Sequence, residues 1–279
     1  MTIRSVSRSD LPIGPAEVGC LWLVPNTLDL GTVAPGLPLP DVREVLPARV
    51  LHVAARLPHW VVENARSARA LLKRIGEVEP LARPLQEIGI RELPRARKGG
   101  GAAGALPALR AADWLAPALA GQDMGLMSEA GLPAVADPGA QLVELAHAAG
   151  VPVRPLSGPS SLMLALAASG LNGQSFAFVG YLPTDAAQRL QRLRELEQQS
   201  RRAQQTQLII ETPYRNTALL AALREGLQPG TRLCVASGLT LAQEAVWTAE
   251  AGQWRGRKLP SLPVELPADV PAVFLFLAR

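Results

Sequence analysis

Hydrophobic residues occur along this chain in two alternating patterns. Short unbroken apolar runs that stop at small or polar residues are typical of buried strands. Between the runs, apolar residues recur at spacings of three and four, which predicts helices with one apolar face. The expected strands are residues 20–25, 60–62, 124–127, 151–156, 176–181, 208–210, 232–237, 244–248 and 272–278. The expected helices are residues 65–75, 106–119, 138–149, 162–169, 184–200 and 216–225, whereas residues 41–57 stay ambiguous.

Residues 124–161 show the two patterns most clearly. An apolar run ends at residue 127, and a polar loop with one glycine follows. Asp137 and Pro138 then predict a helix start, because Asp caps orphan N–H groups and Pro lacks the N–H that would be unpaired there. Gly150 predicts the helix end, since glycine adopts the left-handed cap conformation without a Cβ clash. A second apolar run leads into residues 157–161, so the stretch predicts a β–α–β unit.

The order of the elements predicts two domains. Up to residue 159, strands and helices alternate, as in an α/β domain with a parallel sheet. Beyond it strands outnumber helices, which indicates a mixed sheet. We therefore expect an N-terminal α/β domain, residues 1–159, and a C-terminal α+β domain, residues 160–279. Ligands of parallel sheets bind outside the carboxyl ends of the strands, which points to the loops at 128–131 and 157–161.

Two interpretations of these loops stay open. Small residues let a backbone approach a ligand, and Ser160 and Ser161 offer hydroxyls and N–H groups at a helix start, which suits a small molecule with polar groups. Glycine and serine are also ordinary turn residues. No G-x-G-x-x-G follows a strand, and the glycine run at 99–101 lacks the ending of a P-loop, so neither nucleotide motif is supported.

The composition indicates a folded protein without structural disulfides or metal. Hydrophobic residues make up 48% of the 279 positions and aromatic residues only 4%, so the core must be mainly aliphatic. Cys20 and Cys234 both lie in apolar runs, which favours buried thiols in a reducing compartment. Residues 1–18 are expected to be a disordered arm. The first twenty residues show no secretory pattern, and no apolar run is long enough for a membrane span. We expect a cytoplasmic protein.

The charge is modestly basic and carried mainly by arginine. The formal net charge is +4, and only three lysines, Lys73, Lys98 and Lys258, are present. Arginine matches phosphate with two donors at once, which suits nucleic acid, although an excess of four charges is small. Residues 77–104 are rich in Pro, Gly and Arg and are expected to form a mobile basic loop. It is either a plain surface connection or a lip that touches phosphates.

Hydrolytic and zinc chemistry find no support. The three histidines, His52, His59 and His147, are not paired with cysteine or with one another at ligand spacing. No G-x-S-x-G elbow is present, so a Ser-His-Asp hydrolase is not indicated.

Four motifs, in this order and spacing, resemble those of the tetrapyrrole methylase superfamily. They are SEAGLPAVADPG at 128–139, PLSGPSSLMLALAASGL at 155–171, FVGYLP at 178–183 and ETPYR at 211–215. The pattern is most similar to the branch of small-subunit ribosomal RNA (cytidine-2′-O)-methyltransferases, which carry S-D-A-G-x-P-x-x-x-D-P-G, P-G-P-S, G-F-L-P and E-S-P-H-R. Residues 23–25 and 63–66 resemble the family's opening strand and its E-D-T-R block, whereas the resemblance is weak between about residues 76 and 121.

The resemblance implies a two-domain fold with S-adenosylmethionine held in the cleft between the domains, without a metal, and a homodimer. Carried over by position, it implies these cofactor-binding residues: Pro25, Ala130, Gly131, Leu132, Val135, Ser160, Ser161, Glu211, Thr212, Gly238 and Leu239. Glu63 occupies the place of the Glu in the family's E-D-T-R block and is the candidate base, or else it simply pairs with Arg66 or Arg69. Candidates for substrate contacts are Arg66, which follows a strand end, and Tyr181, Tyr214 and Arg215.

Departures from the family pattern keep three functions open. The family's P-T-P-I-G-N-L is replaced by PNTLDLG at 25–31, Asn64 stands for Asp in the E-D-T-R block, Glu129 for Asp, and Tyr214 for His. The first hypothesis is a methyltransferase acting on ribosomal RNA. The second is a methyltransferase for a tetrapyrrole or another small molecule. The third is a catalytically silent paralogue that binds RNA or a protein.

Overall fold

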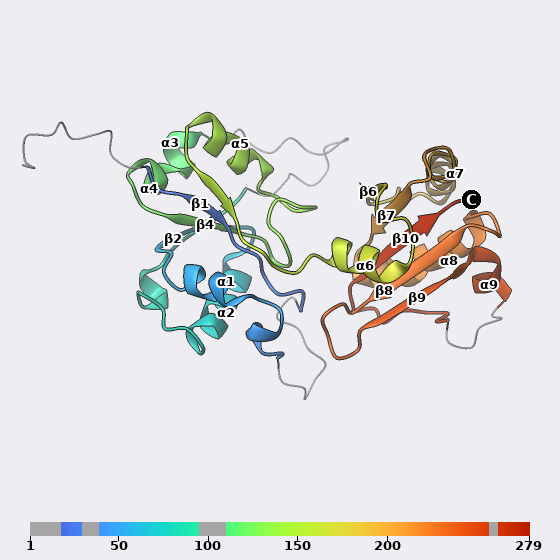
Figure 1. Ribbon diagram of the computed structural model, residues 1–279, viewed down its shortest axis with the longest axis horizontal. Coiled ribbons are helices and arrows are strands. Elements are labelled where there is room, and N and C mark those ends of the chain that lie inside the picture. Colours follow the sequence, from blue (N-terminus) through green and yellow to red (C-terminus); the bar gives the residue numbers. More distant parts are fainter. Residues whose placement is uncertain (1–17, 30–38, 95–109, 257–261) are drawn as a thin grey trace, which may run out of the picture. The chain divides into compact units, whose positions relative to one another are not determined.

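A computed structural model describes residues 18–29, 39–94, 110–256 and 262–279 (Figure 1). The chain divides into two compact units, the first containing Asp41–Gly158 with the described residues before Leu30, and the second containing Pro159–Arg279. The expected N-terminal arm and the basic residues 95–104 lie outside the described residues, apart from Val18.

The first unit is built on a parallel sheet whose central strands are buried, whereas its two outer strands are largely exposed. Its order is β3-β2-β4-β1-β5, and all pairs are parallel. The strands are β1 Leu21–Leu23, β2 His59–Val62, β3 Gly89–Glu92, β4 Met124–Met127 and β5 Val153–Pro155. Trp60 and Val62 pack into one apolar cluster and Val61 into another, as the alternation of side chains along a strand requires.

Helices supply the other half of each cluster. They are η2 Val42–Glu44, α1 Ala48–Ala54, α2 Ala65–Gly76, η3 Leu85–Glu87, α3 Ala111–Trp114, α4 Ala116–Leu119 and α5 Ala140–Ala148. The predicted apolar side of α2, which includes Leu71 and Leu72, is buried in the first cluster, and Leu142 of α5 in the second. The sheet therefore lies between two layers of helix, which is the expected α/β architecture.

The second unit has a mixed sheet in the order β6-β7-β10-β8-β9. Its strands are β6 Phe176–Gly180, β7 Thr206–Ile210, β8 Arg232–Ser237, β9 Ala245–Glu250 and β10 Ala272–Leu277. Only β6 and β7 pair in parallel, whereas β10 runs antiparallel to β7 and β8, and β9 antiparallel to β8. The helices are α6 Ser161–Ser169, α7 Ala186–Ala203, η4 Pro213–Arg215, α8 Asn216–Gly226 and α9 Ala251–Gly256.

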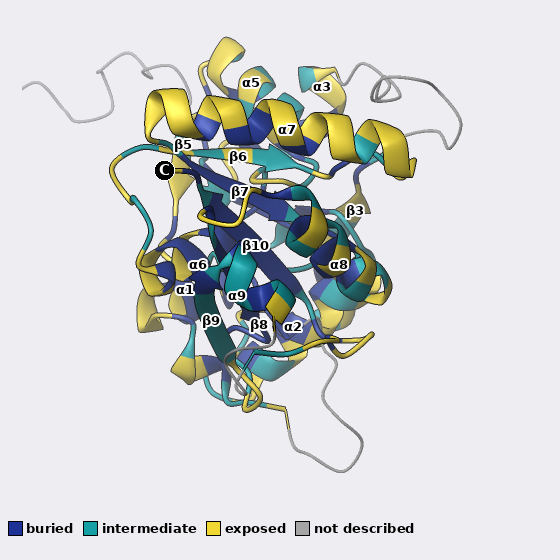
Figure 2. Cartoon of the chain, turned by 90° about the vertical axis from the view of Figure 1, so that its right-hand side faces the viewer, coloured by how far each residue is buried: buried dark blue, intermediate teal, exposed yellow. Residues whose placement is uncertain are grey.

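The core of this second unit lies between its sheet and three helices. Leu193 of α7, Leu220 of α8 and Trp254 of α9 pack with Phe274 and Phe276 of β10. Figure 2 shows the exposed outer face of α7 and the buried strands behind it. With one parallel-sheet and one mixed-sheet unit, the predicted fold class is confirmed.

Three local predictions are wrong. The helix expected from Pro138 begins at Ala140, because Gly139, with φ at 134°, is its N-cap and no side chain caps it. The part of the expected basic loop that is described contains strand β3, whose polar residues gave no apolar run, but which pairs with β2. The described end of the helix expected at 106–119 is two short helices, separated where Pro117 enters α4. Helix α9 was not predicted.

Candidate functional site

The parallel sheet of the first unit brings three loops together at the carboxyl ends of its strands, which we call the first edge. Strands β1, β2 and β4 are neighbours that run in the same direction, so the residues that follow them lie side by side. The backbone N–H of Val24 donates to the carbonyl of Leu126 at 2.9 Å, and that of Glu63 to Met127 at 3.1 Å. The loop of residues 128–131, which we call the β4 loop, therefore lies between the ends of β1 and β2.

Asn26 holds the β4 loop from the side of β1. Its amide Nδ2 donates to the carbonyls of Ser128 and Glu129, at 3.1 and 2.9 Å, and its side-chain oxygen accepts from the backbone of Thr27 at 2.8 Å. Its backbone exchanges two further hydrogen bonds with Gly131, an isolated antiparallel bridge. Asn26 is only 4% exposed, so these bonds are made away from water.

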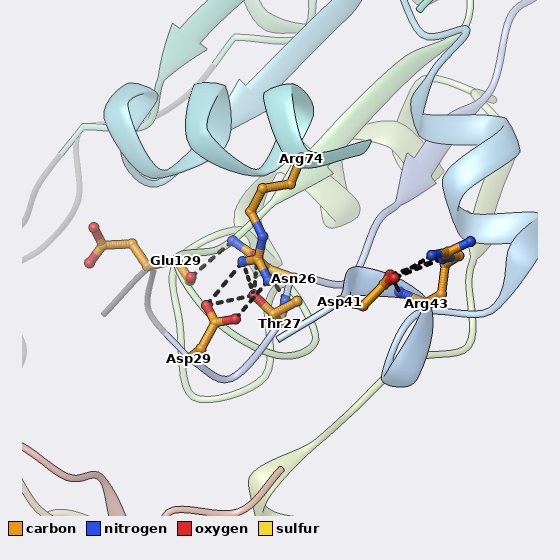
Figure 3. A network of polar contacts seen from close by, with 7 residues as sticks. All are labelled: Asn26, Thr27, Asp29, Asp41, Arg43, Arg74 and Glu129. Carbon is orange, nitrogen blue, oxygen red and sulfur yellow. Dashed lines mark hydrogen bonds and ion pairs between the residues drawn. The ribbon is translucent and has the colours of Figure 1, made fainter. Parts of the chain in front are cut away.

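A buried ion pair continues this network into helix α2 (Figure 3). The guanidinium of Arg74 lies 3.0 Å from the carboxylate of Asp29, and the two side chains are 13% and 3% exposed. The Thr27 hydroxyl donates to Asp29 at 2.9 Å and accepts from Arg74 at 3.3 Å. The segment after β1 is thus tied to the last turn of α2, which is why residues rich in oxygen can be buried there.

Glu63 and Asn64 hold the β4 loop from the side of β2. The Glu63 carboxylate accepts from the backbone N–H of Glu129 at 3.0 Å. The Asn64 amide donates to the Glu129 carboxylate at 2.6 Å, and its oxygen accepts from Arg66 N at 2.9 Å as the N-cap of α2. The predicted base is therefore part of this edge, and no ion pair of Glu63 with Arg66 or Arg69 is found among the described contacts.

Asp137 faces the same group of acids. Burial, followed by the charges of Glu63 and then Glu129, raises the pKa of its carboxyl from 3.8 to about 7, and the Ser128 hydroxyl acts in the opposite direction. Ser128 itself is only 2% exposed. The first edge thus combines two acids, Glu63 and Glu129, with a third, Asp137, whose carboxyl titrates near neutral pH.

The backbone between the β4 loop and α5 is strained. Ala134 and Ala136 have φ of 64° and 65°, a left-handed conformation that costs an L-residue about 1 kcal/mol. Gly131 and Gly139 also have positive φ. Such conformations persist only where the surroundings determine them, and they occur preferentially at functional sites.

Of the cofactor residues implied by the motifs, those in the first unit lie at or beside this edge. Pro25 is buried against Gly158, whose added Cβ would lie 2.3 Å from the proline ring. Gly131 is buried, Ala130 and Leu132 are half-buried, and Val135 is 44% exposed. Arg66, the substrate candidate, is exposed at the start of α2.

The second unit gathers its candidates at one edge of the mixed sheet. Strands β6, β7 and β8 run in the same direction, since β10 is antiparallel to both β7 and β8, so their carboxyl ends share an edge. Glu211 and Thr212 follow β7, and Gly238 and Leu239 follow β8. Gly238 has φ of 61° and its N–H donates to Pro271 at 3.0 Å, beside the start of β10.

Other candidates of this unit have different surroundings. Glu211 is buried and pairs with Arg215 at 2.9 Å, so Arg215 is partly committed within the fold. Tyr214 is 73% and Tyr181 59% exposed. Ser160 is the N-cap of α6 without a capping side-chain bond, and Ser161 begins the helix. The hydroxyl and first N–H groups of α6 are an arrangement suited to an anion.

Three contributors to the first edge were missed from the sequence. Asn26 and Asn64 appeared only as departures from a motif, and Asp137 was interpreted as a helix cap. Asn64 carried one usable signal, since asparagine before an apolar-periodic helix predicts an N-cap. Its contact with Glu129, 65 positions away, left no trace in the local pattern.

Comparison with known proteins places these edges in context. The family model described as Tetrapyrrole (Corrin/Porphyrin) Methylases matches residues 51–254. Three relatives are each named ribosomal RNA small subunit methyltransferase I. The protein of Mesorhizobium japonicum is 31% identical over 96% of this chain and 83% of its own length. The protein of Pseudomonas aeruginosa is 30% identical over 78% of this chain and 70% of its own length. The protein of Synechocystis sp. is 38% identical over 50% of this chain and 48% of its own length. The chain thus spans about half of the last relative.

Solved structures share the fold at low sequence identity. The methyltransferase CobJ superposes with a TM-score of 0.51 at 19% identity, covering 94% of this chain and 95% of its own. A conserved hypothetical protein from Aeropyrum pernix superposes with a TM-score of 0.53 at 18% identity, covering 94% of this chain and 86% of its own. In the part of the chain that the structure describes, no helix is long and apolar enough to span a membrane.

Proposed function

Because this chain belongs to the tetrapyrrole methylase family, we propose that it is an S-adenosylmethionine-dependent methyltransferase acting on a ribose hydroxyl of small-subunit ribosomal RNA. The family predicted from the motifs is confirmed by the family model, which matches residues 51–254. One observation carries the RNA substrate: the 31% identity that extends over 96% of this chain to the ribosomal RNA methyltransferase of Mesorhizobium japonicum.

The chemistry of the first edge fits the cofactor. S-adenosylmethionine carries a sulfonium and an ammonium group, and carboxylates in a partly buried site favour positive charge. Glu63, Glu129 and Asp137 supply three carboxyl groups, of which Asp137 has a pKa of about 7 because of burial and the charges of the other two. When bound, the cofactor supplies a methyl group that is already activated for transfer.

We propose that the residues implied by the motifs bind this cofactor. Gly131, with Ala130 beside it, lets the backbone approach, and the N-terminus of α6 at Ser160 and Ser161 suits the carboxylate of the amino-acid tail. Leu132, Val135 and Leu239 offer apolar cover for the adenine. Pro25, Glu211, Thr212 and Gly238 complete the set proposed from the motifs.

Two acids are candidates for accepting the proton of the ribose hydroxyl. Glu63 is the acid expected from the motif, and its carboxylate is held by Glu129 N at 3.0 Å. Asp137 is the better match to neutral pH, because a general base works best with a pKa near the working pH. The rest of the chemistry is alignment of the hydroxyl with the methyl group.

Exposed groups at the strand ends suit the RNA. Arg66 suits a phosphate, and Tyr181 and Tyr214, 59% and 73% exposed, suit stacking on unpaired bases. Arg215 is proposed as a phosphate contact that stays paired with Glu211. A ribosomal substrate would place the activity in the cytoplasm. From the resemblance alone, we propose that the protein is a homodimer. Light scattering would test this by measuring the molar mass in solution.

The test is transfer of labelled methyl from S-adenosylmethionine to small-subunit ribosomal RNA from a strain lacking its cytidine-2′-O-methyltransferase. We expect one modified ribose, located by primer extension, and no transfer by the Gly131→Trp variant. Calorimetry of cofactor binding runs alongside, with porphyrinoid acceptors as a parallel arm.

The two measurements separate the hypotheses. Cofactor binding with methylation of a porphyrinoid but not of RNA would make the small-molecule enzyme correct. Absence of cofactor binding, with RNA still bound, would indicate the silent paralogue and overturn the methyltransferase proposal.

A further inference from the structure

We propose that Asn26 and Asn64 are positioning residues, which fix the β4 loop, residues 128–131, in the conformation that binds the cofactor. The inference rests on the proposed function. Neither residue is assigned a contact with the cofactor or the acceptor. Both act through the loop that carries Ala130 and Gly131.

The side chain of Asn26 is fully used by the loop and its own turn. Its amide nitrogen donates two hydrogen bonds to consecutive carbonyls, those of Ser128 and Glu129, at 3.1 and 2.9 Å. Its amide oxygen accepts from the backbone N–H of Thr27. Two consecutive carbonyls that converge on one amide leave little freedom for their peptide planes to rotate. The backbone bridge from Asn26 to Gly131 fixes the next peptides as well.

Asn26 is itself anchored on a rigid support. The Thr27 hydroxyl next to it bonds to Asp29, which is paired with Arg74 of α2 at 3.0 Å (Figure 3). At 3% and 13% side-chain exposure, this ion pair is shielded from solvent, so its attraction is less screened than that of a surface pair. Through these contacts, the position of Asn26, and with it that of the β4 loop, is fixed relative to α2.

Asn64 performs two tasks that only an amide can combine. Its oxygen caps α2 by accepting from Arg66 N, and its nitrogen donates to the Glu129 carboxylate at 2.6 Å. An aspartate could cap the helix equally well, but it has no donor for Glu129 when ionised. The exchange Asn64→Asp therefore removes the loop contact while the helix cap remains.

The experiment uses these isosteric exchanges in the full chain. Asn26→Asp replaces a donor by an oxygen facing two carbonyls, and Asn64→Asp sets a carboxylate against Glu129. The double variant Asn64→Asp with Glu129→Gln restores one hydrogen bond, since the new amide donates to the new carboxylate. It also keeps the number of carboxylates at this edge, so the charge that favours the cofactor is retained. The control is Asp41→Asn, which makes the same type of exchange at the exposed Asp41–Arg43 pair, also drawn in Figure 3.

The readouts are the Kd for S-adenosylmethionine by calorimetry, KM and kcat with RNA, and the midpoint of thermal unfolding. We expect both single variants to raise the Kd and the cofactor KM at least about tenfold. Asn64→Asp loses a hydrogen bond to a charge, and Asn26→Asp sets a buried carboxylate against two carbonyl oxygens. Glu129→Gln should return the Asn64→Asp variant to within about threefold of wild type. Asp41→Asn should leave the Kd unchanged, because exposed pairs contribute little.

The inference fails if the wild type binds the cofactor and both single variants bind it within twofold, or if Glu129→Gln does not rescue Asn64→Asp. A lowered unfolding midpoint with an unchanged Kd would likewise overturn it, since that is a structural effect alone. If buried Asn26→Asp does not fold, the partly exposed Asn64–Glu129 pair decides the outcome. A wild type without cofactor binding is a different result, which sinks the proposed function itself.

Discussion

Among single residues, Asp137 is the one whose chemistry the structure changes most. In the sequence it is a helix cap, and in the fold it is a half-buried acid whose carboxyl has a pKa near 7. Because the folded state binds this proton more tightly than the unfolded chain, the group contributes nothing below about pH 4 and destabilises the fold as pH rises toward 7.

The variant Asp137→Asn should therefore be more stable than wild type at pH 8 and about equally stable at pH 4. A rise from 3.8 to about 7 would correspond to about 4 kcal/mol, but the carboxyl is partly exposed, so we expect about 1–2 kcal/mol. Urea unfolding at the two pH values measures the difference. Equal stability at pH 8 would show that the carboxyl titrates normally.

The same variant tests the proton acceptor. If Asp137 is the base, the kcat/KM of wild type rises with pH through about 7 and Asp137→Asn loses that limb. Glu63→Gln then keeps the limb with a lower midpoint, because the Glu63 charge no longer raises the pKa of Asp137. The opposite pattern would assign the base to Glu63. Cofactor binding measured for each variant separates a catalytic effect from a loss of affinity.

Between elements, the contact that shapes the first edge most closely is that of the β1 and β5 ends. Gly158, after β5, allows Pro25, after β1, to approach so closely that an added Cβ would lie 2.3 Å from two atoms of the ring. The φ of Gly158 is not in the left-handed region, so its backbone conformation does not require glycine. Glycine is needed at this position because there is no room for a side chain.

Replacing Gly158 by Ala should lower the free energy of unfolding by about 1–3 kcal/mol, because the backbone of one strand end must move. It should also weaken cofactor binding if Pro25 belongs to that site. Gly173→Ala is the matched control, since nothing lies within 4 Å of the added Cβ, and its effect should be within about 0.5 kcal/mol. Thermal and urea unfolding compare the two variants.

For the whole molecule, each unit has a core of its own. The first has apolar clusters on both faces of its sheet, and the second buries Phe274, Phe276 and Trp254 beneath α7, α8 and α9. Helix α7 is fastened to the turn between α8 and β8 by the buried Glu197, which accepts from the Thr231 hydroxyl at 2.5 Å and from Gln228 N at 2.8 Å. We infer that Pro159–Arg279 can fold alone.

Saturating cofactor should stabilise the full chain and not that fragment. At a concentration 100 times the Kd, binding to the folded state adds about 2.7 kcal/mol to the free energy of unfolding. If residues of both units bind the cofactor, the fragment Pro159–Arg279 should show no rise in its unfolding midpoint. A rise in the fragment would mean that the second unit binds the cofactor without the first.

Much of the fold could be predicted from the sequence, because buried strands and one-sided helices impose local patterns. The run at 124–127 and the glycine stop at Gly170 appear in the structure as expected, as does the buried side of α2. Strand β3 could not be found in this way: it lies at a sheet edge, and its identity depends on a partner, β2. Arg91, expected in a mobile loop, instead stacks on Trp114 at 3.6 Å.

The sequence by itself determined the family, the two kinds of sheet and the motif positions, because these depend on order and spacing along the chain. The tertiary structure alone decided how the motifs are held together. Asn26 meets residues 102 to 105 positions away, and Asn64 meets Glu129. The raised pKa of Asp137 likewise follows from its burial and from the charges of Glu63 and Glu129, which lie far away in the sequence or in another loop. Hydrogen bonds and charges act through space, so no local pattern records them.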